Sequence, residues 1–217
     1  MDILLIAGLW LDGSVWDNVA AQLETLGHRP VPITLPGQGD GNPSATLADQ
    51  VATVVAAVDA AAGRPMVVGH SAACSLAWIA ADARAGKISK VALIGGFPSS
   101  DGEPYFSGFP IRDGAMAFPG WSEFEGPDSA DLEDAARQAF ASTAIPVPEG
   151  VTRGVIRLAD ERRYLTTLAS EVRAMVARGE PISAAAHAAA SERSNWQLFD
   201  DYNTRNATAA FSEIEWE

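Results

Sequence analysis

The chain has 217 residues, of which 47% are hydrophobic and 20% charged, and its formal net charge at pH 7 is −13. This length and composition predict one soluble globular domain, residues 1–217, with a sizeable core; the alternative is two small domains. The acidic balance argues against nucleic acid and anionic membrane surfaces as partners, since both attract basic patches.

Strands and helices alternate in the first half of the chain. Apolar or β-branched runs predict strands at residues 2–7, 30–34, 66–68 and 91–95. Capping signals and apolar spacing predict helices at residues 14–26, 46–62 and 72–85, the first of them capped by Ser14. This alternation predicts an α/β fold with a mostly parallel central sheet and helices on both faces.

Prolines, glycines and aromatic residues crowd the segment from about residue 97 to residue 150, where one helix is predicted at 131–142. We expect a short lid over an apolar pocket, because aromatic side chains bury enough surface to order an irregular insertion. The alternative is a packed surface excursion with no role in ligand binding. The segment contains Tyr105, Phe106, Phe109, Phe118, Trp121, Phe124 and Pro127.

The last third of the chain carries weaker signals. Residues 165–169 are predicted to form a short strand, and residues 171–178 a helix that ends at Gly179. The alanine-rich run 183–192 is predicted to be helical. Further along, residues 196–199 are predicted to form a last strand, with a turn at 200–203.

The segment 65–73 carries the strongest chemical signal. An apolar strand stops at Gly69, Ser71 follows two residues later, and a helix-favouring run begins with Ala72 and Ala73. A strand, a tight turn, a serine and a helix are the context in which a G-x-S-x-G pattern forms a nucleophile elbow. Ala73 stands in place of the second glycine and adds only a methyl group. The alternative is an ordinary strand-to-helix turn with a chance serine.

Together with Gly8-Leu9-Trp10 and Leu35-Pro36-Gly37-Gln38-Gly39, this motif resembles the alpha/beta-hydrolase fold, and especially its small esterase-like serine hydrolases. The resemblance is dense to about residue 97 and poor over the last 50 residues. It implies that Ser71 attacks a carbonyl group. It also implies that the amides of Leu9 and Ala72 form the oxyanion hole, with Trp10 as the neighbour of Leu9.

The resemblance also implies a histidine base oriented by an acid, in the chain order serine, acid, histidine. His187 is the one histidine after Ser71, but it lies before the last predicted strand, whereas Asn206 lies near the position expected for the base. The acid is expected at Glu171, with Asp160 in reserve. His28 and His70 are expected to have structural roles.

Three functions stay open at this point. The first is a serine hydrolase that acts on a small apolar ester, lactone or related carbonyl compound through a Ser71 acyl-enzyme. The second is a cyclase, lyase or decarboxylase that uses the oxyanion hole without a complete triad. The third is a binder of a small apolar ligand, because the fold alone does not choose among these functions.

No cofactor is expected, because the sequence has neither a metal-ligand cluster nor a phosphate-binding or dinucleotide-binding glycine motif. The single cysteine, Cys74, cannot form an internal disulfide and is expected to serve in packing. The chain shows no signal-peptide pattern, and no apolar run approaches the roughly 18 residues of a membrane span. We therefore expect a cytoplasmic protein without a membrane partner, while a homodimer stays open.

Overall fold

The structure is a computed structural model, and it describes residues 1–124, 126, 129–196 and 199–216. The chain divides into two compact units, Met1–Arg157 and Leu158–Glu217, and each unit is described by itself. That residues 1–217 form a single domain stays a prediction.

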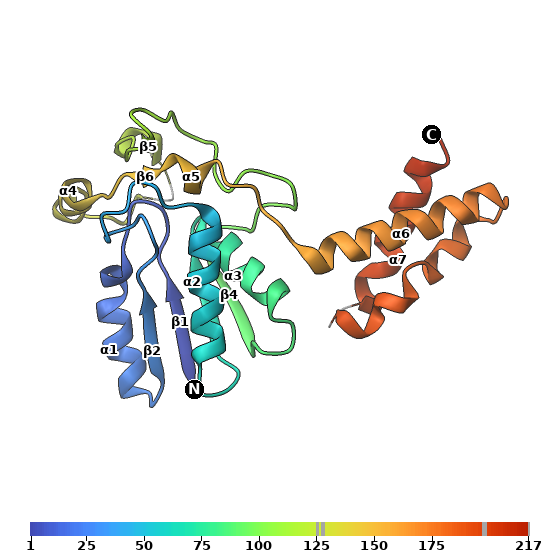
Figure 1. Ribbon diagram of the computed structural model, residues 1–217, viewed down its shortest axis with the longest axis horizontal. Coiled ribbons are helices and arrows are strands. Elements are labelled where there is room, and N and C mark those ends of the chain that lie inside the picture. The colour runs from blue at the N-terminus through green and yellow to red at the C-terminus, as the bar shows by residue number, and fades with distance from the viewer. Residues whose placement is uncertain (125, 127–128, 197–198, 217) are drawn as a thin grey trace. The chain divides into compact units, whose positions relative to one another are not determined.

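Within the described residues, the first unit is built on a four-stranded parallel sheet (Figure 1). The strand order is β2-β1-β3-β4, with β1 at Asp2–Ile6, β2 at Arg29–Ile33, β3 at Met66–His70 and β4 at Lys90–Ile94. The strands and the parallel sheet predicted from the apolar runs are confirmed. Pro30 and Pro32 lie on β2, an edge strand, where a missing N–H costs less pairing.

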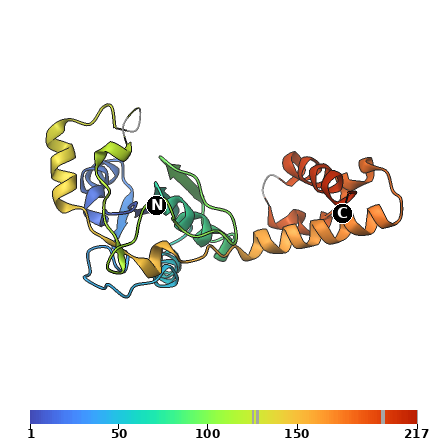
Figure 2. The same cartoon turned by 90° about the horizontal axis from the view of Figure 1, so that it is seen from above.

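Three helices cover the two faces of this sheet. They are α1 at Asp17–Thr25, α2 at Leu47–Ala60 and α3 at Ala73–Ala83. Right-handed crossovers place α1 on one face and α2 and α3 on the other, as Figure 2 shows. On the α1 face, Ile3 and Leu5 of β1 pack with Trp16 and Val68 in a buried apolar cluster. The predicted helices on both faces of the sheet are therefore confirmed.

The helix ends show which capping predictions hold. At α2 the Thr46 hydroxyl accepts from the amide of Asp49, whose carboxylate accepts from the amide of Thr46 in a capping box. The predicted Ser14 cap is wrong, because Asp12 accepts the Ser14 amide and caps the short 3-10 helix η1 at Gly13–Trp16. The cap therefore lies at Asp12, two residues earlier in the chain than predicted.

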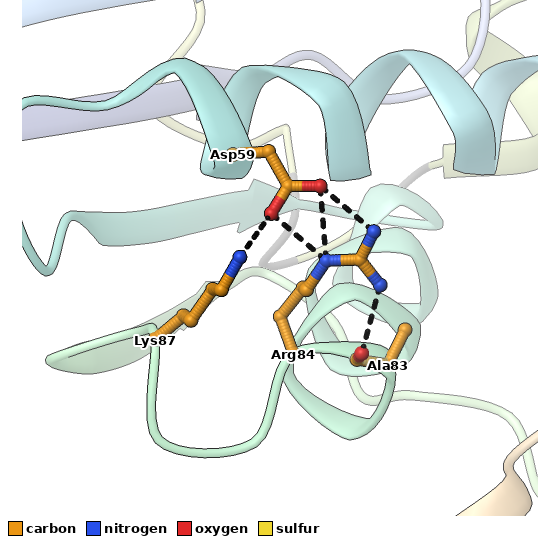
Figure 3. Close-up of polar contacts among 4 residues, drawn as sticks. All are labelled: Asp59, Ala83, Arg84 and Lys87. Carbon is orange, nitrogen blue, oxygen red and sulfur yellow. Dashed lines mark hydrogen bonds and ion pairs between the residues drawn. The ribbon is translucent and has the colours of Figure 1, made fainter.

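An ion-pair network fastens α2 to the end of α3. The Asp59 carboxylate accepts from the Arg84 guanidinium at 2.7 Å and from the Lys87 ammonium at 2.8 Å (Figure 3). The hydrogen bonds from these two cations hold the pKa of Asp59 well below its usual range.

The segment from residue 97 to residue 150 is irregular, as predicted, and ordered by short elements. These are β5 at Ala115–Met116, the 3-10 helix η2 at Trp121–Phe124, α4 at Asp134–Thr143 and β6 at Val147–Pro148, followed by α5 at Glu149–Thr152. β5 and β6 pair as antiparallel strands. The helix predicted at 131–142 is confirmed as α4, whereas Pro127 lies outside the described residues.

The second unit is helical. It contains α6 at Ala159–Ala177, the 3-10 helices η3 at Ile182–His187 and η4 at Ala190–Asn195, and α7 at Phe199–Ile214. Its core gathers buried side chains from α6, η3, the residues just after η3 and α7, including Tyr164, Leu168, Val172, Ala185, Phe199, Ala207 and Phe211.

Two predicted strands are not found in this unit as predicted. The predicted strand at 165–169 is wrong, because these residues lie inside α6 and the neighbouring positions Tyr164, Leu168 and Val172 are buried at helical spacing. The predicted strand at 196–199 is wrong at Phe199, which begins α7, while residues 197 and 198 lie outside the described residues. The predicted turn at 200–203 is also helical.

The predicted helix end at Gly179 is confirmed, since α6 ends at Ala177 and Gly179 has a φ of +69°. The predicted helical run 183–192 is confirmed in part, as two 3-10 segments. Among the described residues, none of the helices is both long and apolar enough to cross a membrane.

Candidate active site

Ser71 lies in the tight turn between β3 and α3. Its φ is +55°, in the left-handed region that a residue with a side chain rarely adopts. The Ser71 amide donates to the carbonyl of Ile94 at 2.8 Å, and the Ser71 carbonyl accepts from the amide of Cys74 at 3.0 Å. Such strain typically costs about 1–3 kcal/mol and persists where the surroundings fix the conformation. The turn has the backbone form of a nucleophile elbow.

Two glycines make room for this turn. A Cβ atom at Gly69 would lie 2.4 Å from the carbonyl oxygen of Ala73, and one at Gly96 would lie 2.6 Å from the carbonyl oxygen of Ser71. Both distances are far below van der Waals contact, so neither position can carry a side chain without moving the elbow. The glycine predicted to be necessary at position 69 therefore has a direct steric reason.

The loop after β1 passes directly beside the serine. A Cβ atom at Gly8 would lie 3.0 Å from the Cβ of Ser71, so a side chain at this position would crowd the serine. Leu9 and Trp10 follow, both buried, and Trp10 has a φ of +65°. β1 and β3 are neighbours whose connections leave in opposite directions, and ligands bind parallel sheets at the carboxyl ends of such strands.

The amides of Leu9 and Ala72 are available for a ligand. Among the described residues, neither of them donates a hydrogen bond to another protein group. Leu9 is buried and Ala72 is the residue before α3, where backbone amides at a helix start point outward without intrahelical partners. Two free amides that flank a strained serine can together stabilise a developing negative charge.

The first unit contains two histidines, His28 and His70. His70 packs edge-on against Trp16, with ring centroids 6.3 Å apart, and burial lowers the pKa of its imidazole. His28 precedes β2 and therefore lies at the amino end of the parallel sheet, whereas Ser71 lies at the carboxyl end. This topology removes His28 from the candidates for the catalytic base.

The predicted base and acids all lie in the second unit. His187 is exposed at the end of η3, and no hydrogen bond joins it to Glu171 among the described residues. The Glu171 carboxylate accepts instead from the amide of Ala189 at 2.8 Å. Asp160 accepts from Arg163 at 2.6 Å in an ion pair one turn apart on α6. The catalytic roles of His187 and Glu171 stay predictions.

Asn206 was predicted to lie in a loop after a last strand, near the position of the catalytic base, and this prediction is wrong. It lies within α7, where its side-chain amide donates to the Tyr164 hydroxyl at 3.2 Å. The same hydroxyl donates to Asn203 at 3.0 Å, so Asn206 belongs to the polar network of the helical core. The prediction failed because its reference strand at 196–199 is not a strand.

Aromatic rings from the lid segment gather around Trp10. The Trp10 ring lies 5.5 Å from Phe118, 5.9 Å from Phe109 and 6.0 Å from Phe124, measured between centroids. Its backbone belongs to the loop beside Ser71, so the lid packs on the candidate oxyanion loop. Tyr105, another aromatic residue of the segment, is buried, and desolvation raises the pKa of its hydroxyl.

An open cavity of about 580 Å³ lies on the lid segment. Its walls are mostly apolar, but they also carry one basic and one acidic residue. The lining consists of Phe109, Pro110, Arg112, Asp113, Ala115, Ala117, Phe118, Pro119 and Pro146. The cavity thus shares Phe109 and Phe118 with the rings around Trp10.

Gln38, in the motif Leu35-Pro36-Gly37-Gln38-Gly39, is a buried polar residue that contacts the loop after β1. Its side-chain amide donates to the carbonyls of Gly8 and Leu11, each at 2.8 Å. In the sequence, the sign of a buried role for Gln38 is its position between Gly37 and Gly39, in the loop after the edge strand β2.

A parallel sheet with a strained serine turn at its carboxyl edge defines an α/β protein with a candidate nucleophile elbow. The model of the alpha/beta hydrolase family matches residues 3–204, and the chain belongs to this family. The family resemblance and the fold class predicted from the motifs are therefore confirmed.

Solved structures share this fold at low sequence identity. An extracellular alpha/beta-hydrolase from a Paenibacillus species has a TM-score of 0.63 and 23% identity, over 73% of this chain and 72% of that one. An Arabidopsis methylesterase has a TM-score of 0.57 and 15% identity, over 73% and 71%. Methylketone synthase I of tomato has a TM-score of 0.55 and 14% identity, over 74% and 73%. No curated protein matched the chain.

Proposed function

We propose that the protein is a serine hydrolase that cleaves small, uncharged esters, lactones or related carbonyl compounds. The carrying observation is the strained Ser71, with a φ of +55°, next to Gly8 in the loop that bears the free Leu9 amide. The esterase-like structural neighbours support the same class of reaction.

In this proposal the Ser71 hydroxyl oxygen adds to the carbonyl carbon of the ester while a base takes its proton. The carbonyl oxygen becomes an oxyanion that accepts hydrogen bonds from the Leu9 and Ala72 amides. Collapse of this intermediate breaks the bond to the alcohol oxygen, which leaves with the proton, and an acyl group remains on Ser71. Water then hydrolyses the acyl-enzyme by the same steps in reverse.

The aromatic rings around Trp10 support an apolar substrate. Phe109, Phe118 and Phe124 present ring faces and edges rather than charges next to the candidate oxyanion loop. The net charge of −13 also disfavours anionic substrates over the molecule as a whole. Short-to-medium acyl chains on an uncharged leaving group fit these surroundings best.

A second candidate is a member of the family that does not hydrolyse esters and uses the oxyanion hole to stabilise an enolate or to bind a ligand. One observation favours it: Glu171, the predicted acid, already accepts the Ala189 amide, and no hydrogen bond links it to His187 among the described residues. A structural neighbour named as a synthase supports the same possibility for the fold.

Labelling with a fluorophosphonate probe tests the proposal. Intact mass should show one adduct on the native protein and none on Ser71→Ala, and p-nitrophenyl butyrate should be hydrolysed faster than a p-nitrophenyl ester with a carboxylate on its acyl chain. Thr152→Val, which changes a buried hydroxyl outside the site, is the matched control and should label normally. Labelling of both or neither of the native and Ser71→Ala proteins would contradict the acyl-enzyme mechanism.

A further inference from the structure

Gln38 is held in one orientation by three hydrogen bonds. Its side-chain nitrogen donates both of its protons, to the carbonyls of Gly8 and Leu11, at 2.8 Å each. Its side-chain oxygen accepts from the Gln50 amide at 3.0 Å. Gln38 is 1% exposed, so these contacts are not shared with bulk water. A buried amide with all of these groups satisfied is a rigid element of structure.

The main chain around Gln38 is shaped to bring this side chain inward. Gly37 and Gly39 on either side have φ values of +79° and +102°. A Cβ atom at Gly37 would lie 2.7 Å from Pro148, so the loop can reach this position only with glycine there. Gln50 on α2 completes the support, because it also donates to the carbonyl of Pro36 at 2.9 Å.

The Gly8 carbonyl and the Leu9 N–H belong to the same peptide unit. This unit is planar and trans, so its carbonyl and its N–H point in opposite directions. A hydrogen bond that fixes the Gly8 carbonyl therefore also fixes the direction in which the Leu9 N–H points. Acceptance at the carbonyl polarises the peptide and strengthens its N–H as a donor. The second bond, to Leu11, fixes the other end of the loop.

We infer that Gln38 is a positioning residue that aims the Leu9 amide at the oxyanion, with Gln50 as its support. This inference rests on the proposed function of the same site and goes beyond it, because it assigns transition-state stabilisation in part to a side chain that never contacts the substrate. The contact that carries it is the Gln38 bond to the Gly8 carbonyl.

Gln38→Met tests the inference, because methionine keeps the length and volume of the side chain and removes both donors. With p-nitrophenyl butyrate we expect kcat to fall about 10- to 100-fold and KM to change less than about threefold, since an oxyanion contact acts mainly in the transition state. A boronic acid that forms a tetrahedral adduct with serine should lose affinity along with kcat/KM. Thr152→Val, at an equally buried position whose hydroxyl donates to the Glu149 carbonyl and not to the loop, should retain the native kcat.

Thermal unfolding of each variant shows whether it is folded, and kcat is expressed per folded molecule. If Gln38→Met does not fold, Gln50→Met takes its place, because it removes the bond that holds the Gln38 side-chain oxygen, together with the Gln50 bond to the Pro36 carbonyl, and so frees the Gln38 amide to turn away from Gly8. We expect that variant to lose about three- to tenfold in kcat. A native kcat in whichever of the two variants is folded would overturn the inference.

The inference and the proposed function fail in different ways. If the native protein itself neither reacts with the fluorophosphonate nor hydrolyses the ester, the proposed function fails, and the role of Gln38 fails with it. If the native protein reacts and folded Gln38→Met reacts at the same rate, the inference alone is overturned.

Discussion

The indole nitrogen of Trp10 donates a hydrogen bond of 3.1 Å to the backbone carbonyl of Met116. This bond ties the loop after β1 to β5 of the lid segment, and the amide of Ile145 holds the Trp10 carbonyl at 2.9 Å from the same side. The loop after β1 is therefore held by the lid segment through Trp10 and by the loop after β2 through Gln38.

Replacement of Trp10 by phenylalanine should loosen the lid. The ring packing is kept in part, but the buried Met116 carbonyl loses its donor, and we expect a loss of about 1–3 kcal/mol in the free energy of unfolding. Limited proteolysis should cut residues 97–150 faster in Trp10→Phe than in the native protein. Trp78→Phe, on the partly exposed surface of α3, is the control and should leave the cleavage rate unchanged.

Substitutions at Ser71 should separate chemistry from strain. Ser71→Ala and Ser71→Gly both remove the hydroxyl and should both abolish labelling. Glycine adopts a φ of +55° without a steric penalty, so Ser71→Gly should be more stable than Ser71→Ala by about 1 kcal/mol in urea unfolding.

Ser170, an exposed residue in the interior of α6, is the control and should show the opposite order, because glycine weakens a helix interior by about 1 kcal/mol relative to alanine. Equal stability of the two Ser71 variants would show that the elbow stores no backbone strain.

The Asp2 carboxylate should contribute to the acid sensitivity of the protein. Arg29 binds it through side-chain hydrogen bonds and the amide of Ala62 donates to it, and together they lower the pKa of Asp2 to about 2. Because the folded pKa lies below the ordinary value of 3.8, the unfolded chain binds the proton first as pH falls. The stabilisation is therefore complete above about pH 4 and is lost as pH falls toward 2.

Urea unfolding between pH 6 and pH 2 should then show a smaller loss of stability on acidification for Asp2→Asn than for the native protein. Glu24→Gln, on the exposed surface of α1, is the control and should follow the native curve. If the stability of Asp2→Asn fell with pH in parallel with that of the native protein, Asp2 would make no contribution to the acid sensitivity.

His187 supplies the sharpest test between the two candidate functions. It is the one histidine after Ser71 in the sequence, and a serine without its base typically loses several orders of magnitude in rate. Under the hydrolase proposal we expect His187→Ala to abolish ester hydrolysis while thermal stability stays native, since the side chain is exposed. His28→Asn should retain activity. Native activity in His187→Ala would remove the predicted triad.

The first unit could be predicted well because its signals are local and strong. The run at residues 2–6 is buried at every position, and Gly95, with a φ of +61°, directly follows β4. The elbow was recognisable because steric limits at Gly69 leave few alternatives to that residue. The contribution of Gln38 could not be predicted, because its partners Gly8 and Gln50 are brought to it only by the parallel pairing of β1 with β2 and by the packing of α2.

The second unit could not be predicted in the same way. Thr166 and Thr167 favour a strand by local preference, but the helix buries Tyr164, Leu168 and Val172, a four-residue spacing that outweighs that preference. The family's order of serine, acid and histidine then placed Asn206 by reference to a strand that is not present at Phe199. Tertiary packing determines the secondary structure of these segments, and the local preferences of their residues alone predict the wrong type.

The central position of β1 has a consequence for how the protein is made. β1 is hydrogen-bonded between β2 and β3, so its second neighbour is available only after residues 66–70 have been synthesised. At a rate of synthesis of roughly 5–20 residues per second, one edge of the apolar strand β1 stays unpaired for several seconds. Such a strand is a template for pairing with other chains. The yield of folded protein should therefore depend on chain concentration and on chaperones during this interval, long before Ser71 is placed in its turn.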